Sequence, residues 1–156
     1  MAKYQPRPGV YPYSIEYPQG WHVDDAQANT VVFYQDDETE GSSFTLVVSG
    51  LQGELSGQQV LQAIGQFVQQ QYPDIRIRLL SARNVPMSGA ASQLVDAEAT
   101  WTGGRQQAMR AVIQVRTLTV AGTGFTSFVY LGGQAPAPAF DALRPVYVRM
   151  IKTFTI

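Results

Sequence analysis

Two periodicities follow one another along this chain, and their order limits the folds it can adopt more than any other feature does. Apolar and polar residues alternate over Tyr11–Tyr17 and again over Ser43–Leu51, which is the pattern of half-buried strands. A helical spacing follows from Ser56 to about Tyr72, alternation returns at Ile75, and a second helical spacing closes the chain. Strands, a helix, more strands and a second helix predict an α+β fold with a central, mostly antiparallel sheet and two main amphipathic helices.

Each helical stretch carries an apolar stripe that should face the sheet. Ser56 is the expected N-cap of the first helix, and Pro73 should end it. The outward side of this helix is rich in glutamine and is expected to be solvated. We expect Phe67 to anchor the first helix in the core and Ile151 to anchor the second. Pro145 lies inside the second pattern, where it should kink the helix or displace its regular part toward the C-terminus.

Further strands are predicted over residues 92–102, 106–119 and 125–131, with glycine-containing turns between them. At Gly103-Gly104 a three-residue loop gives a better register than a two-residue loop. It places Ala97 opposite Met109 and Asp96 opposite Arg110, which separates a mostly apolar face from a charged one. A two-residue loop would mix charged and apolar side chains on both faces.

Length and composition fit one domain. The chain has 156 residues, of which 45% are hydrophobic and 15% charged, enough for one packed core and too few for two ordinary domains. Residues 11–156 are expected to form it. Residues 1–10 contain Pro6 and Pro8 and no periodic pattern, so they are predicted to be a flexible lead or tether. Such a tether suits a mature segment from which an export signal was removed.

Charge excludes one class of partner. The net charge is -1, with Lys3 and Lys152 as the two lysines, so the chain lacks the basic surface that nucleic-acid binding requires. Residues 1–60 hold eight acidic and two basic side chains, whereas residues 61–156 hold four acidic and nine basic ones. The folded molecule is therefore dipolar if the sheet keeps these two parts of the chain apart.

The sequence contains no recognisable catalytic or metal-binding motif. The chain has no cysteine, which excludes disulfides, thiolate zinc sites, thiol nucleophiles and iron–sulfur clusters. His22 is the single histidine, and no GxSxG phrase places a serine for a catalytic triad. The acidic run over residues 36–41 lacks the order of a calcium loop and indicates a solvated loop. We therefore expect no enzyme activity, no cofactor and no bound metal.

Aromatic and acidic residues gather in the first strands and the loop after them. Aromatic side chains can line a core or an exposed contact patch, and those with a polar atom suit the rim of such a patch. This region is the candidate binding site, and its residues are Tyr17, Trp21, His22, Tyr34, Asp36 and Asp37.

Several phrases together resemble the PsbP-like family. They are "YSIEYPQGW" over Tyr13–Trp21, "VVFYQ", "FTLVVSGL", a helix ending in "YP", "GAASQLVDAEATWTGGRQQAMRAVIQVR" over Gly89–Arg116, and a closing "MIKTFTI". That family includes the extrinsic photosystem II protein, a Ran-binding nuclear import factor and bacterial lipoproteins. Where the photosystem protein usually has an arginine–aspartate pair, this chain has Tyr34-Gln35-Asp36-Asp37, so a photosystem role is not expected.

The resemblance implies an α/β/α sandwich, no catalysis, and an extracytoplasmic accessory, binding or scaffold role of the lipoprotein type. Its partner would be an unknown protein or a small ligand, and a segment preceding Met1 would supply a membrane tether. The alternative is a small-ligand carrier or enzyme with a pocket between sheet and helix, in which His22 or buried arginines contact the ligand.

Overall fold

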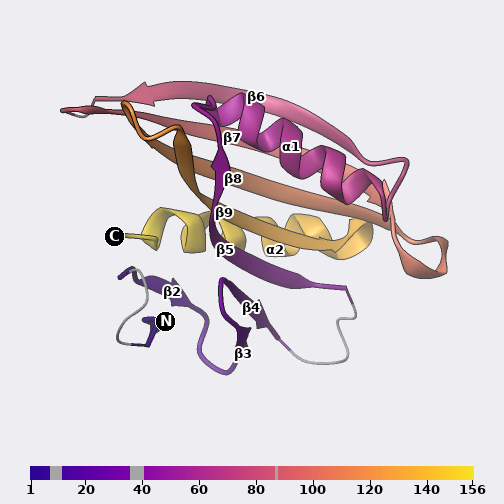
Figure 1. The fold of residues 1–156 in the computed structure, drawn as a ribbon. Coiled ribbons are helices and arrows are strands. Elements are labelled where there is room, and N and C mark those ends of the chain that lie inside the picture. The colour runs from indigo at the N-terminus through magenta and orange to yellow at the C-terminus, as the bar shows by residue number, and fades with distance from the viewer. Residues whose placement is uncertain (8–11, 36–40, 87) are drawn as a thin grey trace.

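A computed structural model describes residues 1–7, 12–35, 41–86 and 88–156 of the chain (Figure 1). Within these ranges, seven strands form one sheet, two short strands form a second, and two helices pack on the large sheet. In chain order the elements are β1 (Ala2–Tyr4), β2 (Ile15–Tyr17), β3 (His22–Gln27), β4 (Thr30–Tyr34), β5 (Ser43–Gln52), α1 (Gly57–Gln69), β6 (Arg76–Val85), β7 (Ala90–Thr102), a 3-10 turn (Gly104–Gln106), β8 (Ala108–Val120), β9 (Phe125–Pro136) and α2 (Ala137–Thr153).

The large sheet is antiparallel at every junction and has the strand order β3-β4-β5-β9-β8-β7-β6. The last long strand, β9, lies at the centre, paired with β5 on one side and β8 on the other. β3 and β6 lie at the two edges. The predicted α+β fold around an antiparallel sheet is confirmed.

Side chains of the central strands alternate between two cores. On β8, Val112 belongs to the core under α2, while Ala111 and Ile113 belong to the core under α1. On β9, Leu131 faces α2 and Phe128 faces α1. The helices therefore cover opposite faces of the sheet, as Figure 1 shows with α1 in magenta and α2 in yellow. This is the α/β/α sandwich that the sequence resemblance implied.

The core under α2 is largely aromatic. Phe33 and Phe44 are fully buried on the sheet, and Tyr147 of α2 packs against Phe44 with ring centroids 6.0 Å apart. The Tyr147 hydroxyl donates a 2.7 Å hydrogen bond to the backbone carbonyl of Gln134 on β9. Burial raises the pKa of Tyr147 well above the ordinary tyrosine value, so the ring enters the core as a neutral hydrogen-bond donor. α2 starts at Ala137 and includes Pro145, so its regular part is not displaced toward the C-terminus.

α1 begins as predicted but differs at one anchor. The Ser56 hydroxyl accepts a 3.1 Å hydrogen bond from the Gln59 amide, and the Gln59 side chain accepts one of 2.8 Å from the Ser56 amide, a complete capping box. The prediction that Phe67 lies in the core is wrong, because its side chain is 76% exposed. Helical spacing places Phe67 at the margin of the stripe formed by Val60 and Leu61, and spacing alone does not tell which margin the sheet covers.

The β7–β8 connection is longer than predicted. Regular pairing ends at Thr102 and Ala108, and the chain between them contains the 3-10 turn. Arg105 and Gln106 have positive φ values of 61° and 57°. The left-handed conformation is therefore adopted by the two residues after the glycines and not by Gly103 or Gly104.

The predicted pairing partners in this hairpin are therefore wrong. Ala97 pairs with Ile113 instead of Met109, and Asp96 pairs with Gln114 instead of Arg110. The slip is four residues, an even number, so every side chain keeps the face assigned to it from the sequence. Asp96 and Arg110 do lie on the same face of the sheet.

The start of the chain contains a strand where a flexible lead was predicted. Ala2–Tyr4 pairs with β2, with Lys3 opposite Glu16 and Tyr4 opposite Ile15. The Tyr4 ring packs edge-on against Phe33 with centroids 5.7 Å apart, which gives this segment an apolar anchor that its lack of periodicity concealed. Residues 8–10 of the predicted lead lie outside the described part of the chain.

The helix anchors can be tested with a pair of alanine substitutions. Ile151→Ala should lower the free energy of unfolding by about 2–5 kcal/mol, because a buried isoleucine leaves both lost transfer energy and a cavity. Phe67→Ala should change it by less than about 0.5 kcal/mol, because the ring is already in water. Denaturant melts measure both values, and equal losses would contradict the assigned faces.

The close approach of α2 to the sheet can be tested at Gly133. A methyl group at this position would lie 2.1 Å from Cγ of Tyr147, so Gly133→Ala should destabilise the fold by about 1–3 kcal/mol through overpacking. Gly104→Ala is the control, because a methyl group there meets open space. Thermal melts of the two variants should separate clearly, and a Gly133→Ala protein as stable as the control would refute this packing.

Candidate binding site

The structure divides the six residues predicted as a site. Tyr17 and Trp21 lie on the α2 side of the sheet, where the Tyr17 ring packs 5.1 Å from Phe33 and Trp21 packs edge-on against Tyr147. His22 and Tyr34 are direct cross-strand partners on β3 and β4, with ring centroids 5.2 Å apart. They lie on the opposite face from Val23 and Phe33, which belong to the core under α2. Of these four residues, the structure therefore pairs His22 with Tyr34, whereas Tyr17 and Trp21 pack against different core rings.

Asp36 and Asp37 lie outside the described residues, so their place relative to His22 and Tyr34 stays a prediction. Of the acids near His22 in the sequence, Asp24 accepts a hydrogen bond from the backbone amide of Ala26, and Asp25 accepts one from the Tyr4 hydroxyl at 3.1 Å. Among the residues that the structure describes, no group of three histidine, aspartate or glutamate side chains could hold a metal ion.

A groove bordered by several arginines lies instead at the other end of the sheet. Its volume is about 330 Å³, and we call it the arginine groove. It lies on the α2 side of β6, β7 and β8, since its members Glu98 and Arg110 share the face of Val112. The residues that define it are Arg76, Arg78, Glu98, Thr100, Arg110 and Phe140.

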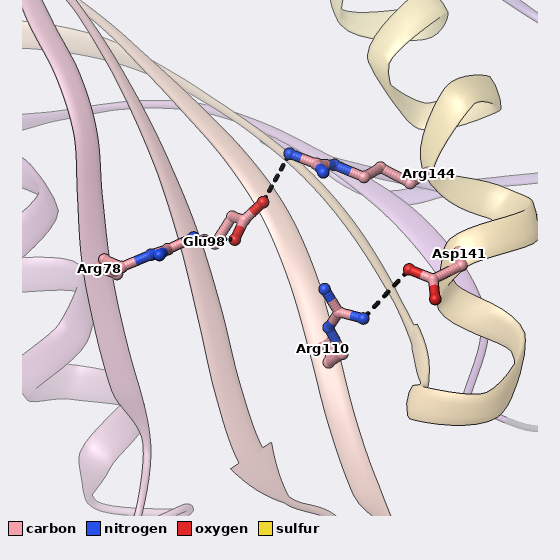
Figure 2. Close-up of polar contacts among 5 residues, drawn as sticks. All are labelled: Arg78, Glu98, Arg110, Asp141 and Arg144. Atoms are coloured by element: carbon pink, nitrogen blue, oxygen red, sulfur yellow. Dashed lines mark hydrogen bonds and ion pairs between the residues drawn. The ribbon is translucent and has the colours of Figure 1, made fainter.

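Glu98 links two arginines across the groove, as Figure 2 shows. Its Oε2 atom lies 2.8 Å from Nη2 of Arg78 on β6, and its Oε1 atom lies 2.6 Å from Nη2 of Arg144 on α2. The Glu98 side chain is only 16% exposed, whereas that of Arg78 is 73% exposed. One shielded carboxylate therefore holds two guanidinium groups, one of which extends into solvent.

Arg110 supplies a third guanidinium from β8. It donates a 3.2 Å hydrogen bond to Asp141 at the start of α2 and stacks over the Phe140 ring at 4.6 Å from the centroid. Stacking on an aromatic face holds the planar guanidinium while its remaining N–H groups stay available. The Asp141 side chain is largely exposed, so a ligand can replace it at little cost.

The balance of charge in this region is positive. Four arginines, Arg76, Arg78, Arg110 and Arg144, face two carboxylates, those of Glu98 and Asp141. Guanidinium groups bind carboxylates and phosphates with two parallel hydrogen bonds. The groove therefore has the chemistry of an anion-binding surface.

A chain of mostly part-buried hydrogen bonds holds α2 beside the groove. Ser81 and Gln114 donate to Asp96, and Gln114 in turn accepts from Nε of Arg116 at 2.7 Å. Arg116 then donates to the carbonyls of Ile151 and Phe154, at 3.0 and 3.2 Å, at the C-terminal end of α2, where the Ile151 carbonyl also accepts a 3.3 Å hydrogen bond from the Phe154 amide. Burial lowers the pKa of Arg116, yet the guanidinium stays charged and neutralises the negative end of the helix.

A second groove runs along the other side of β6, and we call it the α1 groove. Its volume is about 460 Å³ and its apolar lining comes from Leu61, Ile75, Ile77 and Leu79. Exposed glutamines of α1 form its rim, so it opens to solvent rather than enclosing a ligand. β6 therefore separates a positively charged groove from an apolar one.

Sequence reasoning missed the arginine groove, although one signal for it was visible. Arg76 and Arg78 alternate with Ile75, Ile77 and Leu79, which places two arginines on one face of β6. Nothing in the sequence shows that Arg110 and Arg144, far along the chain, reach the same face.

No protein-family model and no curated protein matches the sequence, whereas several solved structures match the fold. Cyanobacterial PsbP (CyanoP) from Synechocystis sp. PCC 6803 has a TM-score of 0.60 and 13% identity, over 99% of this chain and 91% of that one. LpqN, involved in cell envelope biogenesis of Mycobacterium tuberculosis, has a TM-score of 0.54 and 13% identity, over 99% and 90%. The Ran-binding protein Mog1p of Saccharomyces cerevisiae has a TM-score of 0.53 and 10% identity, over 99% and 94%.

This chain has the Mog1/PsbP-like fold. Identities of 10–13% establish the fold and nothing finer, so the role of the arginine groove must be argued from its own chemistry. No helix among the described residues is both long enough and apolar enough to cross a membrane.

The hydrogen-bond chain that positions α2 can be tested at Arg116. Arg116→Met keeps much of the side-chain volume but removes the bonds to Gln114, Ile151 and Phe154, so it should cost about 1–3 kcal/mol of stability. Arg149→Met, at an exposed arginine of α2, should change stability by less than about 0.5 kcal/mol. Urea melts decide, and two equally stable variants would show that this chain of bonds does not hold the helix.

Proposed function

We propose that this protein is a non-catalytic accessory or binding module that works outside the cytoplasm, and that its arginine groove binds an anionic group of a partner protein. The observation that carries this proposal is the shared carboxylate of Glu98, which holds Arg78 and Arg144 in place with Arg110 beside them. Three guanidinium groups preorganised in this way lose little conformational entropy when an anion arrives.

The groove lacks the groups that a catalytic site needs. Its ionisable side chains are arginines and two carboxylates, and both carboxylates are already paired with arginines. His22, the single histidine, lies on edge strand β3 at the other end of the sheet, with its ring beside Tyr34. Among the described residues, the histidine and the carboxylates of the groove are therefore far apart in the sheet, which supports binding rather than chemistry.

The extracytoplasmic part of the proposal rests on the sequence resemblance to lipoprotein-type PsbP-like proteins, with a membrane tether supplied ahead of Met1. It is supported by the likeness in fold to LpqN, a protein of cell envelope biogenesis. Complete absence of cysteine is compatible with export, because no thiol needs protection from oxidation.

A small-ligand carrier is the second candidate, favoured by the size of the α1 groove. Its rim of exposed glutamines argues against it, since carriers usually enclose most of the surface of their ligand. On the other face, the space between sheet and α2 is filled by Phe140, Tyr147 and Met150, all essentially fully buried.

The proposal can be tested with a fluorescein-labelled glutamate-rich peptide, measured by fluorescence anisotropy at low ionic strength. The Arg78→Met/Arg110→Met double variant should bind at least about tenfold more weakly, because two charge-assisted contacts are lost.

Arg149→Met/Lys152→Met is the charge-matched control for this experiment, because it removes two positive charges from α2 at exposed positions that do not line the groove. Equal losses for this control and for Arg78→Met/Arg110→Met would show unspecific attraction and contradict the proposal. Tight binding of inorganic phosphate or citrate, with no binding of the peptide, would favour the carrier instead.

A further inference from the structure

β6 is the open edge of the sheet beside both grooves. It is ten residues long, pairs with β7 on one side, and has no strand on its other side among the described residues. Nearly all of its side chains are exposed. An edge of this kind presents unpaired backbone N–H and C=O groups that can accept another strand.

We propose that β6 accepts an extended segment of a partner protein as an additional strand, and that this segment alternates acidic and apolar residues. The inference rests on the proposed function, because the acidic side chains of the segment would be the anions that the arginine groove binds. Strand addition takes its affinity from main-chain hydrogen bonds and its specificity from pockets for alternate side chains.

The α2 side of the edge selects the acidic positions. Arg76 and Arg78 share this side, line the arginine groove and are exposed. In an added strand, side chains directly opposite each other have Cβ atoms about 5 Å apart, within reach of an arginine–carboxylate pair. Every second residue of the segment therefore meets a guanidinium group.

The α1 side of the edge selects the apolar positions. Ile77 and Leu79 share that side and line the α1 groove, and Leu79 is 44% exposed. Apolar side chains of the segment opposite Ile77 and Leu79 would cover Leu79 and face the α1 groove, which Leu61 also lines. The acidic and apolar residues of the partner segment thus alternate with the same period as the arginines and apolar residues of β6.

A bulge limits where the segment can pair. The register of β6 against β7 shifts between Leu79 and Ser81, which leaves Leu80 without a direct partner on β7. Bulges interrupt regular pairing along an edge. The pairing region is therefore Arg76–Leu79, the stretch that borders both grooves.

Charge argues against a second copy of this chain as the occupant. Antiparallel pairing of two β6 strands that keeps Ile77 and Leu79 on the α1 side places arginines opposite arginines on the other side. Like charges directly opposite each other destabilise a strand pair. With an acidic partner, the arginines lie opposite carboxylates instead, and the interaction is attractive.

The test uses three labelled peptides of identical length and charge. One alternates glutamate and valine, the second has the same residues in two blocks, and the third is the alternating peptide with alternate backbone amides N-methylated. Anisotropy should show the alternating peptide binding about tenfold more tightly than the other two, because it alone offers both the side-chain pattern and the main-chain donors. Hydrogen exchange of the complex should slow at Arg76–Leu79.

Leu79→Asn and Leu80→Asn form a matched pair of variants, since the two side chains are 44% and 45% exposed and only the first lines the α1 groove. Leu79→Asn should weaken binding of the alternating peptide, and Leu80→Asn should not. Equal effects of the two substitutions would overturn the inference.

The outcomes separate this inference from the proposed function. If the three peptides bind equally and all lose affinity in Arg78→Met/Arg110→Met, strand addition is overturned while anion binding stands. If an alternating glutamine–valine peptide binds as well as the glutamate peptide and protects β6, strand addition stands and anion recognition fails. A concentration-dependent dimer that protects β6 without peptide would overturn the partner proposed here in favour of a second copy.

Discussion

Contact between Tyr147 and Gly133 fixes the distance between α2 and the centre of the sheet, and the rest of the structure depends on it. Gly133 lies on β9, the central strand, and the absence of a side chain there lets the Tyr147 ring press against the backbone and its hydroxyl reach the carbonyl of Gln134. Two neighbouring aromatic rings, Phe44 and Trp21, pack on the same tyrosine. Tyr147 holds the middle of α2 against the sheet, and Arg116 holds its C-terminal end. Together these contacts fix the position of α2 on the sheet.

That position explains why polar groups lie on a face that would otherwise be core. α2 packs mainly on β8 and β9, so the same face of β6 and β7 is left beyond the edge of the helix. Along these strands, apolar side chains that face α1 alternate with polar side chains that face the uncovered side, as Ile77 and Arg78 show. Burying Glu98 between two arginines would be unfavourable in the core, but at this margin the guanidinium groups keep contact with water.

The sequence predicted both helices, the order of the strands around them, the N-cap at Ser56 and the burial of Ile151, because these depend on local periodicity and capping chemistry. The prediction for Phe67 was wrong because periodicity does not show which margin of α1 the sheet covers. The strand Ala2–Tyr4 was missed because it depends on the packing of Tyr4 on Phe33. The β7–β8 register was wrong because the turn places Arg105 and Gln106 in the left-handed region. The arginine groove combines residues from three strands and α2, so no single stretch of sequence carries its signal.

Strand order also decides how the uneven charge of the chain is distributed in space. The acidic first part contributes β3, β4 and β5 to one end of the sheet, and the basic second part contributes β8, β7 and β6 to the other, with β9 between them. A topology that interleaved the two parts would have cancelled the asymmetry, whereas this one keeps them apart. Among the described residues, edge strand β6 carries Arg76, Arg78 and Arg83, and edge strand β3 carries Asp24 and Asp25, so the same topology that leaves two edges open also makes them electrostatically different.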